Sequence, residues 1–184
     1  SSESPMQGGG HDPARNGFNF QALELALGAS VDPYFRADAQ LVFLRGGVEV
    51  EEAYATTMAL PFRLQARAGQ FLTRFGRFNA THLHAWDFAD QPFFWTKVFG
   101  GDGNRGLGVE ASWLAPTPWY LEVVGSASEA SGGGTARTFL GGADPAPWVR
   151  DPRLVQAVVA VKQFFPLGDS LSLSLGVSAA TGPH

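Results

Sequence analysis

Apolar and polar residues alternate along eight segments of this 184-residue chain, and this period of two constrains the fold most. Successive side chains of a β-strand point to opposite faces, so alternation predicts strands with one apolar and one polar face. The clearest case runs from residue 35 to residue 43, where one face carries Phe35, Ala37, Ala39, Leu41 and Phe43 and the other Arg36, Asp38 and Gln40. The predicted strands lie within residues 17–31, 35–43, 48–58, 64–68, 107–113, 119–126, 155–162 and 170–177. No amphipathic helix is predicted.

The segment from residue 48 to residue 58 is less regular. The alternation assigns Val48, Val50, Tyr54 and Met58 to one face and Glu49, Glu51, Ala53 and Thr57 to the other. Glu52 is a charged residue at a position of the first, otherwise apolar, face. We therefore expect one strand with a single exception to its apolar side.

The connections between the predicted strands differ in length. Four are short turns that contain proline, at residues 31–34, 59–62, 115–118 and 165–169. Two are long, at residues 72–104 and 128–152, and only residues 45–47 form a short link on that side. Short turns on one side and long loops on the other are typical of bacterial outer-membrane barrels. An interfacial girdle is predicted beside the short turns, from Tyr34, Phe35, Phe62, Trp113, Trp119, Phe164 and Phe165.

Alternation by itself is also compatible with a soluble barrel whose apolar face points inward. Three observations favour the membrane interpretation: ionisable residues on the polar face of most strands, the unequal turns, and the many Ala and Gly residues on the apolar face. Charged residues make up only 16% of the chain, where about a quarter is usual. The predicted fold is an all-β, antiparallel, up-and-down transmembrane β-barrel. A soluble β-barrel that binds a small apolar ligand remains the alternative.

The order of the short and long connections indicates whether the predicted barrel is complete. The first connection is a short turn, so both ends of the predicted strand set lie on the long-loop side, whereas complete barrels have both termini on the short-turn side. We expect an incomplete segment of about eight strands from a larger barrel, formed by residues 17–184. Residues 1–16 are predicted to be a flexible segment or loop, and they lack the pattern of a signal peptide.

Composition and motifs exclude several classes of function. The net charge of −4 and the absence of a basic face argue against nucleic-acid binding. There is no cysteine, which removes thiolate chemistry and disulfides. The chain contains no hydrolase elbow, P-loop, dinucleotide fingerprint or zinc-protease motif, so we expect no enzyme. The expected partners are membrane lipid and a small solute or ion, and a homo-oligomer remains open.

One stretch is more specific than the strands. GQFLTRFGRFNATHLHAWDF, residues 69–88, resembles the bacterial outer-membrane family labelled zinc-regulated TonB-dependent outer-membrane receptors. Through the element G-Q-F-x-x-x-F-G it is similar, more distantly, to phosphate-selective porins. The resemblance extends over nearly all of the chain. It implies a barrel in the bacterial outer membrane that lets a small solute pass. We expect porin-like, passive passage, with a TonB-dependent receptor for metal uptake as the alternative.

Residues 69–88 begin on a predicted strand and enter the longest loop, which in a porin-like barrel would fold inward and narrow the pore. The candidate residues of the pore lining and constriction are Arg36, Asp38, Glu49, Glu51, Arg67, Arg74, Arg77, Glu110 and Glu122. The arginines, with Arg105, could favour anions, or they could pair with the carboxylates for structural reasons. The acidic residues on neighbouring strands favour pairing.

A metal site is the last hypothesis. His82, His84 and Asp87 are the candidate ligands, because imidazoles two residues apart on an extended chain share one face and a carboxylate can complete a zinc site. Zinc is thus the single cofactor considered, and otherwise none is expected.

Overall fold

A computed structural model describes residues 22–44, 46–82, 85, 91–101, 103–129 and 155–182. These residues form one eight-stranded antiparallel sheet in which the strands follow each other in sequence order. The strands are β1 (Leu23–Ser30), β2 (Phe35–Leu44), β3 (Gly47–Thr57), β4 (Leu64–Leu72), β5 (Arg105–Leu114), β6 (Tyr120–Glu129), β7 (Val155–Pro166) and β8 (Ser172–Thr181). The prediction of an all-β, up-and-down antiparallel arrangement is confirmed.

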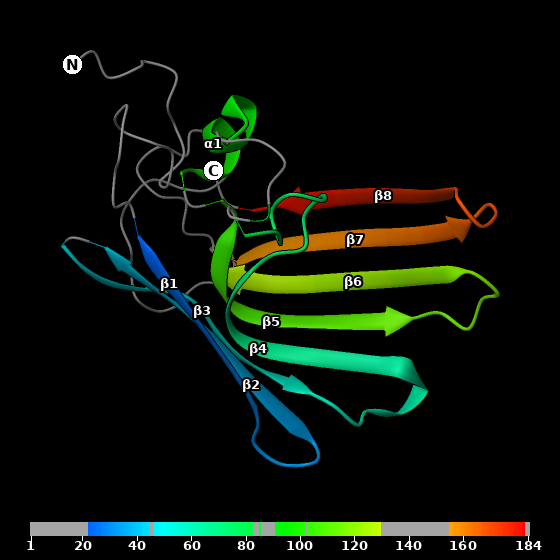
Figure 1. Ribbon diagram of the computed structural model, residues 1–184, viewed down its shortest axis with the longest axis horizontal. Helices are drawn as coiled ribbons and strands as arrows, with labels where there is room; N and C mark the ends of the chain where they lie inside the picture. The colour runs from blue at the N-terminus through cyan, green and yellow to red at the C-terminus, as the bar shows by residue number, and fades with distance from the viewer. Residues whose placement is uncertain are drawn as a thin grey trace.

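The sheet is open in the part of the chain that the structure describes, where β1 pairs only with β2 and β8 only with β7. Figure 1 shows β1 to β3 running obliquely to β4 to β8, so the sheet is strongly bent. The short connections between β5 and β6 and between β7 and β8 lie at one end, and the segment that joins β4 to β5 begins at the other. The predicted leading segment, residues 1–16, and most of the predicted loop 128–152 lie outside the described residues.

Local hydrogen bonds explain the first turn. The Asp32 side-chain oxygen Oδ1 accepts the backbone N–H groups of Tyr34 and Phe35, both at 2.7 Å, which closes the turn after β1. Large aromatic side chains beside the short turns are exposed: Tyr34, Phe35, Phe62, Trp113, Trp119, Tyr120 and Phe164.

On β3, β5, β6 and β7 the polar face of the sheet is more buried than the apolar face, the reverse of the order usual in a soluble protein. Val109 on the apolar face of β5 is 57% exposed, whereas Glu110 beside it is 3% exposed. On β1 and β8, at the two edges of the sheet, both faces are largely exposed. The exposed apolar residues include Leu25, Leu27, Val50, Leu107, Val159, Leu173, Leu175 and Val177. The buried polar residues include Glu51, Glu52, Ser126, Ser128 and Gln156.

The strand β3 contains a β-bulge that the sequence analysis did not identify. Gln40 pairs with Glu52 and Leu41 with Val50, so Glu51 is the extra residue of the bulge. An extra residue in a strand reverses the faces of all residues that follow it. The assignment of Tyr54 and Met58 to the apolar face is therefore wrong. Both line a cavity on the polar face, and Ala53 is exposed on the opposite side.

The long connection between β4 and β5 contains a short helix, α1 (Phe93–Phe99), which the sequence analysis, expecting no amphipathic helix, did not identify. Seven residues are too few for a periodic signal, and helices of this length depend on tertiary packing. Trp95 and Phe99 pack against Phe75, with ring centroids 5.6 Å and 5.1 Å from that of Phe75. Gly100, with φ 94°, ends the helix. No described helix has the length and apolar character needed to cross a membrane.

Candidate functional site

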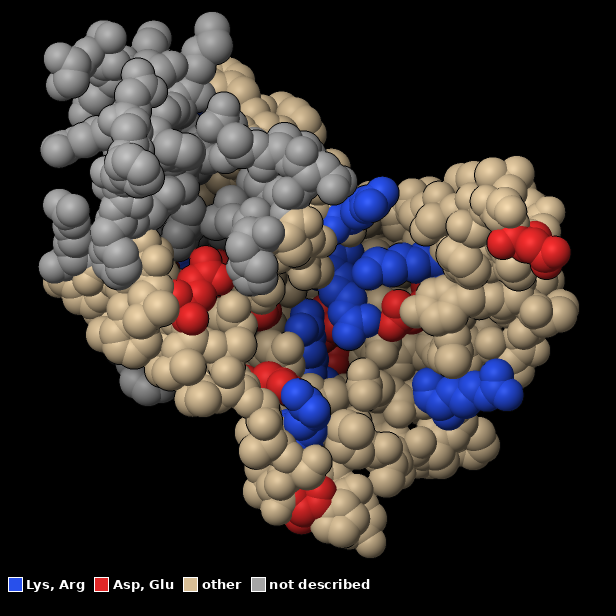
Figure 2. All heavy atoms as spheres, viewed as in Figure 1, with Lys and Arg blue, Asp and Glu red and all other residues tan. Residues whose placement is uncertain are grey.

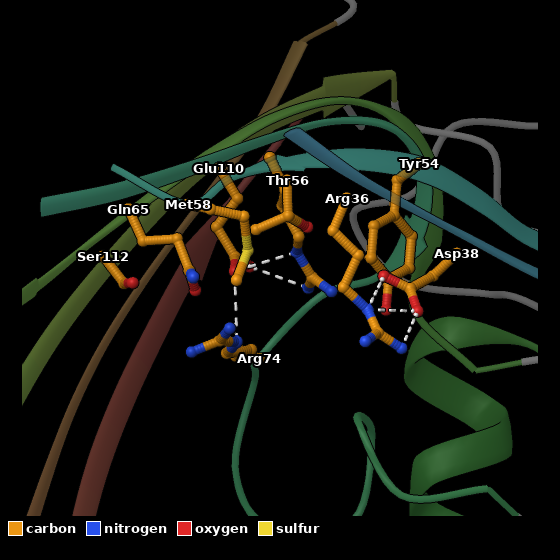
Figure 3. A pocket seen from close by; sticks show the side chains of 10 residues that line it. Arg36, Asp38, Tyr54, Thr56, Met58, Gln65, Arg74, Glu110 and Ser112 are labelled. Atoms are coloured by element: carbon orange, nitrogen blue, oxygen red, sulfur yellow. Dashed lines mark hydrogen bonds and ion pairs between the residues drawn. The ribbon is translucent and has the colours of Figure 1, made fainter. Parts of the chain in front are cut away.

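The centre of the polar face is a cluster of ion pairs around Glu110. The register of β4 and β5 places Arg67 directly opposite Glu110, and Arg67 Nε lies 3.0 Å from Glu110 Oε1. Arg74, from the long connection, places its Nε 3.1 Å from the same oxygen and its Nη1 2.7 Å from Glu122 Oε1. Glu110 thus joins two guanidinium groups, one from the sheet and one from the connection (Figure 3).

Two aromatic rings hold the Arg67 guanidinium in place. Its central carbon lies 4.9 Å from the centroid of the Tyr54 ring and 4.4 Å from that of Phe71. Arg67 Nη2 also donates to the backbone oxygen of Leu72 at 3.0 Å. Cation–π contacts in a partly desolvated site add to the ion pair, so Arg67 is fixed in one orientation.

Two further ion pairs lie on the polar face. Arg36 Nη2 lies 2.8 Å from Asp38 Oδ1, and Arg105 Nη2 lies 2.6 Å from Glu49 Oε1. Figure 2 shows basic and acidic side chains gathered around a hollow near the centre of this view. Arg77 is exposed and has no ion pair with another described residue. Of the two interpretations of the arginines, the structure shows the paired one for Arg67, Arg74 and Arg105.

The bulge in β3 creates a second charged group. It turns the adjacent side chains of Glu51 and Glu52 to the polar face, where both contact His82 of the long connection. His82 Nδ1 lies 3.3 Å from Glu51 Oε2, and His82 Nε2 lies 3.1 Å from Glu52 Oε2. Hydrogen bonds to Glu51 and Glu52 raise the pKa of His82 to about 10 against the opposing effect of burial.

The structure places only one of the three predicted metal ligands. His84 and Asp87 lie outside the described residues. The two ring nitrogens of His82 face Glu51 and Glu52, and its raised pKa favours the imidazolium, from which a metal would first have to displace a proton. Among the residues with a described position, no group of three or more His, Asp or Glu side chains is arranged to hold a metal ion.

The G-Q-F-x-x-x-F-G element explains how the long connection is joined to the sheet. Gln70 Nε2 donates to the Val50 and Glu51 backbone oxygens, at 2.6 Å and 3.2 Å, where the bulge interrupts the strand ladder. Phe71 is fully buried. The backbone N–H of Gly76 donates to Ser178 Oγ on β8 at 2.9 Å. Together with Arg74 and His82, these contacts hold the connection across the polar face from β3 to β8.

Asn79 joins the two ends of this connection through hydrogen bonds. Its Nδ2 donates to the backbone oxygens of Thr73 and Asn104, at 2.7 Å and 2.8 Å. Its Oδ1 accepts the backbone N–H of Asn104 at 2.7 Å. Asn79 is 4% exposed, so these bonds are shielded from water. One buried amide therefore ties the two ends of a segment of about thirty residues together.

Two adjoining cavities lie on the polar face. The larger, of about 260 Å³, contains the Arg36–Asp38 and Arg74–Glu110 pairs (Figure 3). Its other lining residues are Tyr54, Thr56, Met58, Gln65, Arg67 and Ser112. A cavity of about 200 Å³ includes Gly28, Gln40, Glu52 and His82 and shares Arg36, Asp38 and Tyr54 with the first. Sequence reasoning did not identify Tyr54, Thr56 and Met58 as residues of the cavity lining. The signal that could have identified them is the pair of adjacent residues Glu51 and Glu52, which interrupts the alternation and indicates a bulge.

Replacing His82 with Gln is expected to remove a pH-dependent part of the stability. The pKa of His82 is raised from 6.5 to about 10, so its stabilisation is fully present below pH 6.5 and is lost as the pH rises towards 10. The difference in the free energy of unfolding between wild type and His82→Gln should shrink across this window. Denaturant titrations at several pH values measure it, and a difference that stays constant would contradict the assignment.

Comparison with known proteins adds one relative. The chain is 46% identical over 117 residues to a protein of Aquifex aeolicus (strain VF5) described only as uncharacterized. The match covers 61% of this chain and 25% of the relative, so the aligned part spans about a quarter of that protein. No protein-family model matches the chain, and no solved structure does.

Proposed function

We propose that the sheet is part of the wall of a bacterial outer-membrane β-barrel and that its polar face lines a passage for a small solute or ion. The observation that carries this proposal is the reversed burial of the two faces. Large apolar side chains such as Leu107, Val109 and Val159 are exposed on one face of β5 and β7, while Glu51, Glu52, Glu110 and Gln156 are buried on the opposite face of the sheet. Lipid is the solvent in which such an arrangement is stable.

The dimensions support the same conclusion. The strands contain 8 to 12 residues, and a tilted strand needs about 9–11 to cross the hydrocarbon core. The exposed aromatic residues beside the short turns fit the position of an interfacial girdle. Monomeric soluble proteins rarely expose continuous apolar surface of more than a few hundred Å². A soluble barrel with an apolar ligand inside would need the opposite orientation of the faces.

The polar face supports a passage narrowed by the long connection. Arg74 and His82 attach this connection to carboxylates on β3, β5 and β6, so its backbone occupies space in front of the sheet. An inward-folded segment of this kind restricts a pore, and the charges beside it set selectivity. Most arginines are neutralised by carboxylates, so we expect a weak anion bias rather than a strong one.

The test is ionic conductance across a planar bilayer by the full-length protein, refolded in detergent. Steady conductance, with a reversal potential in asymmetric salt that indicates a weak preference for anions, is the expected result. Arg67→Ala should reduce that preference. A protein that stays monodisperse without detergent, or one that inserts folded and does not conduct, would overturn the proposal.

A further inference from the structure

Residues 74–78 form a short strap that lies across the polar face of the sheet. Asn79 Nδ2 donates to the backbone oxygen and to the hydroxyl oxygen of Thr73, at 2.7 Å and 3.2 Å, so the two ends of the strap are held together at its base. Gly76, with φ 63°, bends the strap at its exposed tip. A short segment whose ends are fixed to each other can move as one unit about that base.

The strap contacts the sheet on both sides of β7. Arg74 pairs with Glu122 on β6, and the backbone N–H of Gly76 donates to Ser178 Oγ on β8. The register places Ala160 of β7 directly opposite Ser178. The strap therefore crosses β7 at Ala160, which is buried although it lies on the polar face.

The aromatic contacts of the strap lie within the long connection itself. Phe75 packs on Trp95 and Phe99 of α1, and α1 belongs to the same connection. The contacts that join the strap to the sheet are the ion pairs of Arg74 and the hydrogen bond of Gly76. Release of the strap from the sheet would therefore break polar contacts and leave the aromatic cluster intact.

Both carboxylates that Arg74 contacts have a second basic residue within the sheet. Glu110 accepts two contacts from Arg67, from Nε to Oε1 at 3.0 Å and from Nη2 to Oε2 at 3.1 Å. Lys162 lies directly opposite Glu122 in the register of β6 and β7. The Cβ atoms of residues paired in this way are about 5 Å apart, so the long side chain of Lys162 can reach the carboxylate of Glu122.

Lys162 nevertheless forms no ion pair with another described residue. Glu122 instead pairs with Arg74 Nη1 at 2.7 Å and accepts the hydroxyl of Tyr120 at 2.8 Å. Two cations thus compete for one carboxylate, and the cation of the strap occupies it. If Arg74 leaves, Lys162 can take its place and Glu110 keeps its other partner, so neither carboxylate becomes an unpaired charge.

We propose that the strap docks reversibly on the polar face and that Lys162, by replacing Arg74 at Glu122, stabilises the released state. In the docked state the strap covers β7 and occupies space in front of the sheet. In the released state the Arg74 side chain is in water and Ala160 is uncovered. The effect on transport, a wider passage, rests on the proposed function, whereas the docking equilibrium itself does not.

The test is the reactivity of a thiol beneath the strap in the full-length, detergent-folded protein. This chain contains no cysteine, so Ala160→Cys supplies one thiol whose reaction with a water-soluble maleimide requires release of the strap. Arg74→Gln should increase the reaction rate about tenfold, because it removes charged hydrogen bonds that hold the strap. Lys162→Met should decrease the rate about threefold, the effect of a partly exposed ion pair, and Lys162→Arg should restore it.

The direction of the Lys162→Met effect separates release of the strap from unfolding. A variant that only destabilised the fold would make the thiol at position 160 react faster, not more slowly. Ser174→Cys is the matched control, because Ser174 lies on the same face of β8 as Ser178 but is exposed. Its thiol should react at one rate in the wild-type, Arg74→Gln and Lys162→Met backgrounds.

The outcomes also separate this proposal from the one on the passage. Equal rates at position 160 with and without Arg74→Gln would overturn docking through Arg74. An equal or faster rate in Lys162→Met would overturn the role of Lys162 in release. In planar bilayers we expect Arg74→Gln to raise the conductance. Thiol rates as expected without any change in conductance would overturn the effect on the passage and leave the reversible strap intact.

Discussion

Gly69→Ala is expected to lower the free energy of unfolding by about 3 kcal/mol or more. Gly69 has φ 135°, a conformation that L side chains rarely adopt. A Cβ at this position would lie 2.3 Å from the backbone oxygen of Ala53 and 2.6 Å from Tyr54 Cα. Both obstacles are backbone atoms of the paired strand, so β3 and β4 would have to separate where the bulge and the charged groups are held.

Gly125→Ala is the matched control for this prediction. Gly125 also lies within a strand of the same sheet, yet a Cβ there would meet nothing within 4 Å. Chemical denaturation of the detergent-folded protein, followed by tryptophan fluorescence, should show a large loss for Gly69→Ala and little change for Gly125→Ala. Equal effects of the two substitutions would show that close approach of β3 and β4 does not limit stability.

Glu110→Ala should have the second large effect, a loss of about 3–5 kcal/mol. The side chain of Glu110 is 2% exposed and pairs with Arg67 and Arg74, whose side chains are 10% and 22% exposed. Without this carboxylate, Arg67 remains buried between two aromatic rings with no ion-pair partner among the described residues. Breaking one side of a buried pair costs far more than replacing both sides with apolar residues.

A double variant distinguishes pairing from packing. Arg67→Met combined with Glu110→Leu removes both charges and retains bulk, while Arg74 keeps its contact with Glu122 at 2.7 Å. We expect the double variant to unfold at a higher denaturant concentration than Glu110→Ala. If the double variant is as unstable as the single one, the loss comes from packing around Glu110 rather than from an unpaired guanidinium.

Particular residues show how far the sequence predicts the site. The alternation around Arg67 and Glu110 predicts that both lie on the polar face, and the antiparallel order of β4 and β5 makes them neighbours. Their direct pairing depends on register, which the sequence does not specify over a connection of more than thirty residues. The contact of Arg74 with Glu122 depends on the path of that connection, so it could not be predicted from spacing.

The alternating pattern and the proline-containing turns were sufficient, on their own, to determine an antiparallel sheet of eight strands in sequence order. They were sufficient because strand periodicity and turn chemistry are local properties of the chain. Only the tertiary structure decided which face Tyr54 occupies, that residues 93–99 are helical, and that His82 binds Glu51 and Glu52. The physical reason is that the bulge, the short helix and the ion pairs are stabilised by contacts between segments far apart in the sequence.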